Sequence, residues 1–181
     1  MAAVNYVAAA AGLDPTVSFA HLGDVHDYNS LVWNGTPIPE YNLEVYWLNV
    51  EKKRIIDNLT DSMISEVQSG FMADVLEPGT FRRYDTSIQG QIGIIGAQVY
   101  STRDIDHPTG HSFRVASYDS VYGLIGIHEY TADQISALID VFATFSENLM
   151  EKLTTKVNQI IAIDDVHPHH SLDLVYAITW D

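Results

Sequence analysis

The pattern of hydrophobic and polar positions is clearest in the last third of the chain. Between Leu172 and Trp180, large apolar side chains alternate with smaller or polar ones. A period of two is typical of a half-buried β-strand, and a strand this close to a terminus is expected to lie within a sheet, because free termini fray. The pattern predicts a closing strand whose one face is formed by Leu172, Leu174, Tyr176, Ile178 and Trp180.

A long amphipathic helix is predicted over residues 131–157. Thr131 and Gln134 have the spacing of a capping box, in which the threonine hydroxyl accepts from an early backbone N–H and the glutamine reaches back. Residues 159–163 are predicted to form a short strand, and a turn follows over residues 164–171. The apolar stripe of the helix consists of Ile135, Leu138, Ile139, Phe142, Leu149 and Leu153.

An earlier helix is predicted over about residues 43–70. In its second half, apolar residues repeat at intervals of three and four, and Gly70 fits the position just past a helix end. Its first half, residues 43–50, is rich in strand-forming side chains, so helix and strand both stay open there.

Residues 72–130 show no comparable helical pattern. Residues 91–100 and 120–129 read as two buried strands, residues 113–117 as a further edge strand, and residues 101–112 as a loop. Three glycines are spaced by three residues, but no helix start follows them, so they do not match a nucleotide-binding fingerprint. Close sheet packing is the expected role of these glycines, which are Gly90, Gly93 and Gly96.

The first 42 residues are predicted to be a loop-rich N-terminal arm. Residues 1–12 are alanine-rich and indicate a docking arm or a short helix. Asn34-Gly35 and several prolines indicate loops with at most one hairpin over residues 13–42. We therefore expect an α+β fold, with a single domain over residues 43–181 in which two long helices pack on a mixed, mainly antiparallel sheet.

The strongly acidic composition narrows the classes of function that the chain could have. The chain has 181 residues, of which 24 are acidic and 9 basic, and its formal net charge is −15. Such a field repels phosphate and argues against a DNA-reading protein, but it suits a surface that DNA passes without adhering. Cysteine is absent, which excludes disulfides, thiolate metal ligands and cysteine nucleophiles. No stretch approaches the length of a membrane span, so we expect no membrane partner.

The histidines form two groups that invite a test for metal binding. His107 and His111 are four residues apart, but Pro108 and Gly110 argue against the helix that would place both rings on one face. The second group lies in a predicted turn, where polar residues are common. We expect no metal and no cofactor, with a metal-binding protein kept as an alternative for the group Asp164, Asp165, His167, His169 and His170.

Catalysis has little support in the sequence. The acidic pairs Asp104/Asp106 and Asp164/Asp165 could act in acid–base chemistry only if burial separated their pKa values. The chain has neither a glycine-rich phosphate loop nor a nucleophile elbow. We therefore expect no enzymatic activity, with a small soluble enzyme as the less favoured alternative.

Five of the nine basic residues lie within residues 51–54 and 82–83. In so acidic a chain, these groups could contact an acidic patch on a second copy, and head-to-tail contacts of this kind close into rings when the rotation permits. Aromatic side chains also favour interfaces. The candidate subunit-interface residues are Trp33, Tyr41, Lys52, Lys53, Arg54, Arg82 and Arg83.

The last eleven residues, Ser171-Leu-Asp-Leu-Val-Tyr-Ala-Ile-Thr-Trp-Asp181, resemble the close of the tail terminator proteins of long-tailed bacteriophages. That close reads serine-x-aspartate-leucine-x-tyrosine-x-isoleucine-threonine-aromatic. The predicted order of elements over residues 43–181 is similar to that family's, whereas the first forty residues have no counterpart in its minimal members.

This resemblance implies a virion protein at the head–tail junction. It implies a ring, usually a hexamer, that stops growth of the tail tube and joins the tube to the head connector proteins. Double-stranded DNA would pass through the lumen without sequence-specific binding, and no catalytic residue is implied. Another virion subunit, such as a tail-tube, connector or decoration protein, is the alternative.

Overall fold

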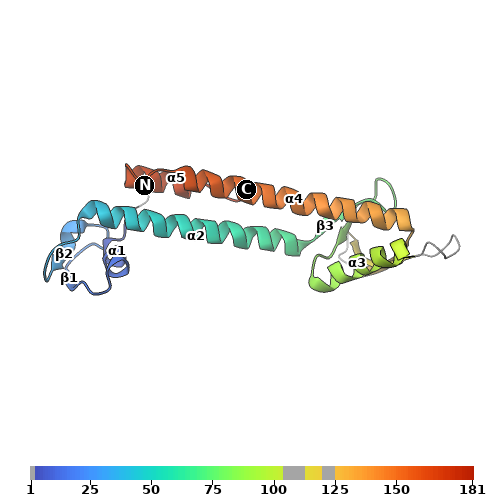
Figure 1. Ribbon diagram of the computed structural model, residues 1–181, viewed down its shortest axis with the longest axis horizontal. Coiled ribbons are helices and arrows are strands. Elements are labelled where there is room, and N and C mark those ends of the chain that lie inside the picture. The colour runs from blue at the N-terminus through green and yellow to red at the C-terminus, as the bar shows by residue number, and fades with distance from the viewer. Residues whose placement is uncertain (1–2, 104–112, 120–124) are drawn as a thin grey trace. The chain divides into compact units, whose positions relative to one another are not determined.

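The computed structural model describes residues 3–103, 113–119 and 125–181 (Figure 1). The chain has an α+β fold, as predicted. It divides into two compact units: unit 1 is Met1–Asp61 with Leu153–Asp181, and unit 2 is Ser62–Lys152. Residues 1–42 lie in unit 1 with residues 43–61 and the C-terminal segment.

Two long helices are present, α2 (Glu40–Ser69) and α4 (Ala132–Ala162). The capping box forms at the start of α4: the Thr131 N–H donates to Oε1 of Gln134 across 2.9 Å, and the Gln134 N–H donates to Oγ1 of Thr131 across 3.3 Å. The predicted strand at residues 159–163 is wrong, because α4 continues through that segment. Ile160 is buried there and its two successors are exposed, so the burial follows one helix face.

Unit 1 contains the N-terminal elements α1 (Tyr6–Leu13), β1 (Phe19–His21), η1 (Tyr28–Ser30) and β2 (Leu31–Trp33). Strands β1 and β2 pair antiparallel and form one hairpin, and Asn34-Gly35 follows β2 and lies outside its connection. Asn5 caps α1, with Oδ1 accepting from the Ala8 N–H across 2.9 Å. The core of unit 1 contains Val4, Tyr6, Ala9, Ala10, Leu31, Leu43, Leu48, Leu172 and Val175.

The predicted closing strand is wrong, because its residues belong largely to a helix, α5 (Pro168–Tyr176). Proline at the first helical position is favourable, since its missing N–H would be unpaired there anyway. The buried residues recur at helical intervals, whereas Leu174, which belonged to the predicted strand face, is exposed. These buried residues are Pro168, Ser171, Leu172 and Val175.

Unit 2 contains a four-stranded sheet in the order β3-β4-β5-β6, in which every described pair of strands is antiparallel. The strands are β3 (Phe71–Ala73), β4 (Arg82–Tyr84), β5 (Phe113–Asp119) and β6 (Ile125–Tyr130). Residues 113–117 form a strand as predicted, but β5 lies between β4 and β6 and is not an edge. Of the strand predicted over residues 120–129, the first five residues lie outside the described part.

The core of unit 2 lies between this sheet and the N-terminal part of α4. Ile135 and Leu138 of α4 are fully buried, and one face of the sheet contributes Phe71, Tyr84 and Tyr130 to the same cluster. Aromatic rings dominate the contact, with the Phe71 ring stacked on Tyr84 at a centroid separation of 5.3 Å. One predicted long helix thus packs on a sheet here.

The predicted strand over residues 91–100 is wrong, because these residues form helix α3 (Ile88–Arg103). Ser87 starts the helix: its Oγ accepts from the Gly90 N–H across 3.2 Å, and its carbonyl accepts from the Gln91 N–H across 2.8 Å. Asp85 accepts from the Ser87 N–H across 2.7 Å and fixes this turn. Of the predicted loop over residues 101–112, the first three residues belong to α3 and residues 104–112 lie outside the described part.

Candidate interaction site

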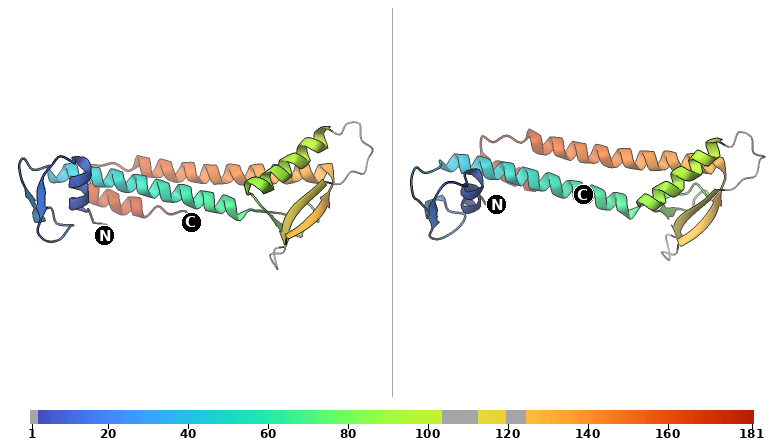
Figure 2. Two further views of the ribbon diagram at one scale, coloured as in Figure 1. Left: turned by 90° about the horizontal axis from the view of Figure 1, so that it is seen from below. Right: turned by 60° about the horizontal axis from the view of Figure 1, so that its bottom comes forward.

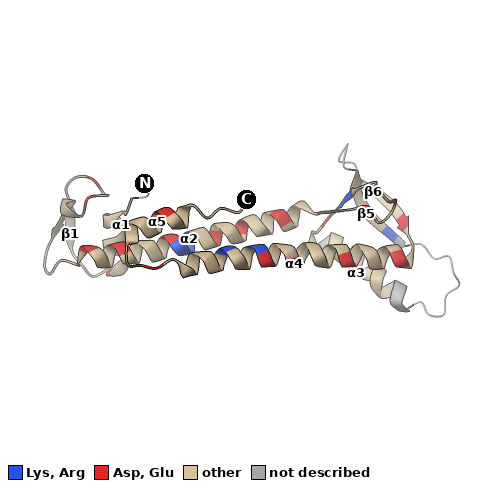
Figure 3. Cartoon of the chain, turned by 90° about the horizontal axis from the view of Figure 1, so that it is seen from above, with Lys and Arg blue, Asp and Glu red and all other residues tan. Residues whose placement is uncertain are grey.

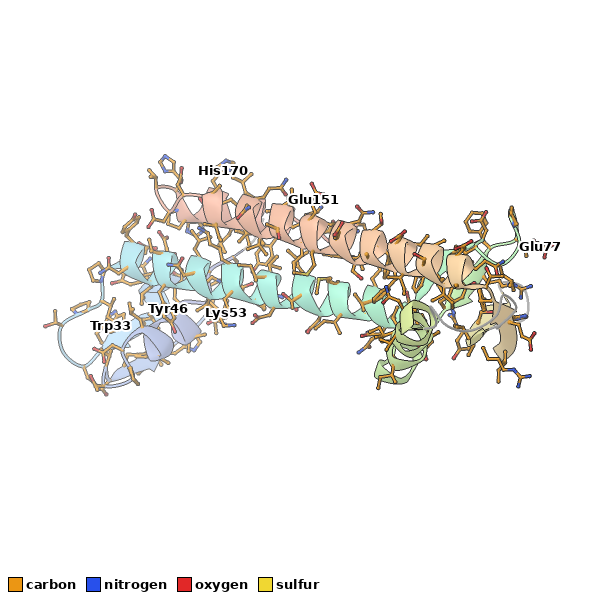
Figure 4. The ribbon with its side chains drawn as sticks, turned by 45° about the vertical axis from the view of Figure 1, so that its right-hand side comes forward. Trp33, Tyr46, Lys53, Glu77, Glu151 and His170 are labelled. Carbon is orange, nitrogen blue, oxygen red and sulfur yellow. The ribbon has the colours of Figure 1, made fainter. Side chains whose placement is uncertain are left out.

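The three basic residues predicted on α2 all have polar partners within unit 1. Nζ of Lys52 donates to the Ile163 carbonyl. Lys53 projects from α2 into solvent (Figure 4) and forms an exposed ion pair with Asp57 across 2.7 Å. Exposed pairs of this kind contribute little stability. The Lys53 side chain is 75% exposed, so its charge can reach a partner.

Arg54 pairs with a carboxylate that the helix buries. Its Nη2 lies 2.6 Å from Oε2 of Glu51, one turn earlier on α2. The pKa of Arg54 is raised, chiefly by the hydrogen bond to Glu51. The Arg54 side chain is half exposed, so one side of it pairs with the buried Glu51 while the other faces solvent.

The aromatic residues predicted at an interface have different surroundings. Trp33 belongs to a cluster in unit 1, with its ring centroid 5.6 Å from Phe19 and 6.3 Å from Tyr28 (Figure 4). Tyr41 is 49% exposed, and its hydroxyl donates to the Asp165 carbonyl across 3.2 Å. Tyr41 therefore presents its ring to solvent, whereas Trp33 packs against its neighbours.

Arg82 and Arg83 lie on β4 in unit 2, and their side chains point to opposite faces of the sheet because successive strand residues alternate. Nη1 of Arg82 lies 3.2 Å from Nε2 of His128 on β6. Burial, and then the charge of Arg82, lowers the pKa of His128, so the neutral ring accepts this hydrogen bond. Arg83 stacks on Tyr118, with 4.7 Å between the guanidinium carbon and the ring centroid.

The second histidine group contributes a polar contact. Nε2 of His169 lies 2.8 Å from Oε1 of Glu44, which also accepts from the Tyr6 hydroxyl across 2.9 Å. Across the described residues, no three histidine or acidic side chains come together in a group that could hold a metal ion. His107, His111, Asp104 and Asp106 lie outside those residues.

A surface that the sequence analysis did not identify lies on unit 2, where α3 borders β5 (Figure 2). A hollow of about 280 Å³, here named the α3–β5 hollow, opens between the two elements. Glycines line its α3 side, and Asp85 and Arg114 bring charges of opposite sign. The lining residues are Asp85, Gly90, Gly93, Ile94, Arg114, Val115, Ala116 and Tyr118.

The outward face of α3 is apolar. Ile94 and Ala97 are buried against the sheet, whereas Ile92 is 64% exposed and Ile95 is 50% exposed. Residues 88–102 contain no charged side chain, and Figure 3 shows the described part of α3 in tan, the colour of uncharged residues. The signal in the sequence was the spacing of Ile92, Ile95 and Val99 at three and four, which is helical.

Comparisons of the chain with protein-family models, with characterised proteins and with solved structures gave no match. Within the described ranges, no helix has both the length and the apolar character needed to cross a membrane.

Proposed function

We propose that the protein is a structural subunit of a bacteriophage virion and acts by assembling with further copies of itself. The observation that carries this proposal is the exposed, uncharged face of α3, with Ile92 and Ile95 in solvent beside the α3–β5 hollow. Burying an isoleucine stabilises a contact by roughly 1.5–3 kcal/mol, so covering this face favours association. A projecting apolar group beside a hollow fits a protein contact better than catalytic chemistry.

Within the virion, we assign the subunit to the head–tail junction, as a tail terminator ring. Two features support this position: the letters of residues 171–181, and the net charge of −15. An acidic lumen would let double-stranded DNA pass without adhering. Because residues 168–176 are helical, the support from this segment rests on its letters and not on a shared strand.

The oligomeric state of the purified protein tests both the proposed self-assembly and the proposed position as a tail terminator ring. Light scattering during size-exclusion chromatography should give a closed oligomer, and negative-stain electron microscopy should show rings with sixfold symmetry. A monomer at every concentration would contradict the assembly function. Long fibres would contradict the terminator position and favour a tail-tube protein.

A functional assay tests the position directly. Added to growing tail tubes, the protein should stop elongation and remain at one end of each tube. A control with bovine serum albumin of equal concentration should leave the tubes growing. Decoration along the whole tube would contradict the terminator position.

A further inference from the structure

The two edges of the unit 2 sheet differ in length. Strand β3 forms one edge and has three residues, whereas β6 forms the other and has six (Figure 2). A short edge strand offers few backbone groups to a further strand. Among the described residues, β6 pairs only with β5, so the backbone N–H and C=O groups of alternate β6 residues point away from the sheet without a strand partner there.

Strand β6 has few of the features that protect an edge. Its six residues, Ile125–Tyr130, include neither lysine nor proline. Its register with β5 runs residue for residue, so no bulge turns the strand out of reach. Such an edge is a template for an added strand. The occupant that matches the spacing of its backbone groups is another extended polypeptide segment.

One face of β6 defines the side chains that an added strand would meet. Ile127 is 70% exposed, and Glu129 lies on the same face because strand residues alternate. The Glu129 carboxylate lies 3.5 Å from Nη2 of Arg114 on β5, with 59% of the Glu129 side chain and 74% of the Arg114 side chain exposed. Exposed pairs of this kind contribute little, so a cation on the other side of β6 can also pair with Glu129.

Charge decides between a second copy of the chain and a basic segment as the occupant. A second copy brings its own net charge of −15, and the one acidic or basic residue on its β6 is again Glu129. Like charges on neighbouring strands oppose pairing. A segment that carries lysine or arginine is instead attracted by the field of the whole chain, which speeds its encounter. The charges therefore favour a basic segment.

We propose that β6 binds an extended, basic segment of another protein, which joins the sheet of unit 2 as a fifth strand. An apolar side chain of the segment lies beside Ile127, and a lysine or arginine lies beside Glu129. Backbone hydrogen bonds along β6 supply the affinity, and these two positions supply the preference for sequence. The contact needs one copy only, so it is independent of the proposed self-assembly through α3.

Three synthetic heptapeptides test this contact with the full chain. The probe is Thr-Lys-Thr-Val-Thr-Lys-Thr, whose palindromic order places valine beside Ile127 and a lysine beside Glu129 in either strand direction. The acidic control replaces both lysines by glutamate. The proline control replaces the valine by proline, which keeps the charge but removes a backbone donor and disfavours pairing as a strand.

Two measurements follow the peptides. Fluorescence anisotropy gives the affinity, and the basic probe should bind about 10-fold more tightly than either control. Hydrogen–deuterium exchange read by mass spectrometry gives the location. The basic probe should slow exchange over residues 125–130, because the outward N–H groups of β6 acquire hydrogen-bond partners.

Exposed side chains of β6 test the preference for sequence. Glu129→Gln should weaken binding of the basic probe by about 2- to 5-fold. Its matched control is Glu151→Gln, which removes one exposed charge from α4 of the same unit and should leave binding nearly unchanged. Ile127→Thr keeps a β-branched residue and should weaken binding by about 3- to 10-fold. Circular dichroism should show an unchanged fold for all three variants.

Each contrary result overturns a stated part of the inference. Equal binding of the basic probe and its proline control would refute strand addition and leave only attraction between opposite charges. Equal binding of the basic and acidic peptides would refute the basic partner. Unchanged exchange over residues 125–130 with all three peptides would refute β6 as the site. None of these results bears on self-assembly, which the oligomeric state of the unaltered protein tests separately.

Discussion

The hydroxyl of Tyr176 donates a hydrogen bond to Oε2 of Glu51 across 2.6 Å and thereby joins α5 to α2. Glu51 is only 5% exposed, and the same oxygen accepts from Nε of Arg54 across 2.8 Å. The Arg54 guanidinium lies over the Tyr176 ring, 5.6 Å from its centroid. A buried carboxylate is tolerated only when it is paired and hydrogen-bonded, so the position of α5 depends on these three side chains as well as on apolar contacts.

Replacing Tyr176 by phenylalanine should therefore lower the free energy of unfolding by about 1–3 kcal/mol, because Glu51 would lose one of its buried partners. Urea denaturation followed by circular dichroism measures this loss. Tyr41→Phe is the control: its hydroxyl also donates a hydrogen bond to a residue distant in sequence, but the acceptor is the backbone carbonyl of Asp165 and the position is exposed. We expect the control to change stability by less than about 0.5 kcal/mol. Equal losses in both variants would contradict the role of burial.

Local signals explain which elements could be predicted from the sequence. The capping box at Thr131 and the positive-φ glycine after α2 act through neighbouring residues, so the pattern identifies them without tertiary information. The hairpin of β1 and β2 is different, because its connection, residues 22–30, contains neither Asn34-Gly35 nor a proline. Fold class and the two long helices could therefore be predicted.

Helices α3 and α5 could not be identified, because short apolar runs fit either a helix or a strand. In α5, Leu172, Leu174 and Tyr176 alternate like a strand. In the folded chain, however, the Tyr176 hydroxyl donates a hydrogen bond to the distant Glu51, and Leu172 and Val175 pack together in the core of unit 1. In α3, a glycine-rich apolar run hides the start at Ser87. In both segments, contacts with residues distant in the sequence select the helix over the strand.

The candidate site was missed for the same reason. The α3–β5 hollow forms only if residues 88–103 are helical and pack against β5. Strand β5 begins ten residues after the end of α3, so this packing cannot be predicted from a local pattern. The sequence pointed instead to basic residues, and the contacts of Lys52 and Arg54 within unit 1 could be seen only in the structure.

Two glycines of unit 2 form a matched pair for testing backbone strain. Gly70 has φ 86° and Gly79 has φ 85°, and L side chains disfavour this region. A Cβ on Gly70 would also lie 2.3 Å from the Tyr84 carbonyl oxygen, whereas one on Gly79 would meet nothing within 4 Å. Gly79→Ala should cost about 1–2 kcal/mol from strain alone, and Gly70→Ala should cost clearly more. Thermal unfolding of both variants gives the comparison, and a Gly79→Ala loss equal to that of Gly70→Ala would contradict the steric argument.

The pairing of Arg82 with His128 predicts a directional change in titration. Burial is the larger cause of the lowered His128 pKa, and the Arg82 charge is the smaller one. Arg82→Gln should therefore raise the pKa of His128 part of the way toward its ordinary value. NMR titration of the imidazole protons measures the change. A pKa that stays the same or falls would show that the Arg82 charge does not reach the ring.

From the raised pKa of the buried Tyr84 hydroxyl, we predict that the protein loses stability at alkaline pH. Its hydroxyl lies 2.9 Å from that of Tyr130 in the core of unit 2, and burial first, then this hydrogen bond, raises the Tyr84 pKa above its ordinary value. The unfolded chain releases the Tyr84 proton near pH 10, whereas the folded chain keeps it, so rising pH favours unfolding by up to about 1.4 kcal/mol per pH unit.

The urea midpoint should accordingly fall as the pH rises above about 10, and Tyr84→Phe should make that fall shallower. Well below that pH, Tyr84→Phe should instead lower the midpoint, because Tyr130 loses this hydrogen-bond partner in a buried position, at a cost of about 1–3 kcal/mol. The two curves should therefore converge with increasing pH. Parallel curves over the whole range would show that Tyr84 ionises as readily in the folded chain as in the unfolded one.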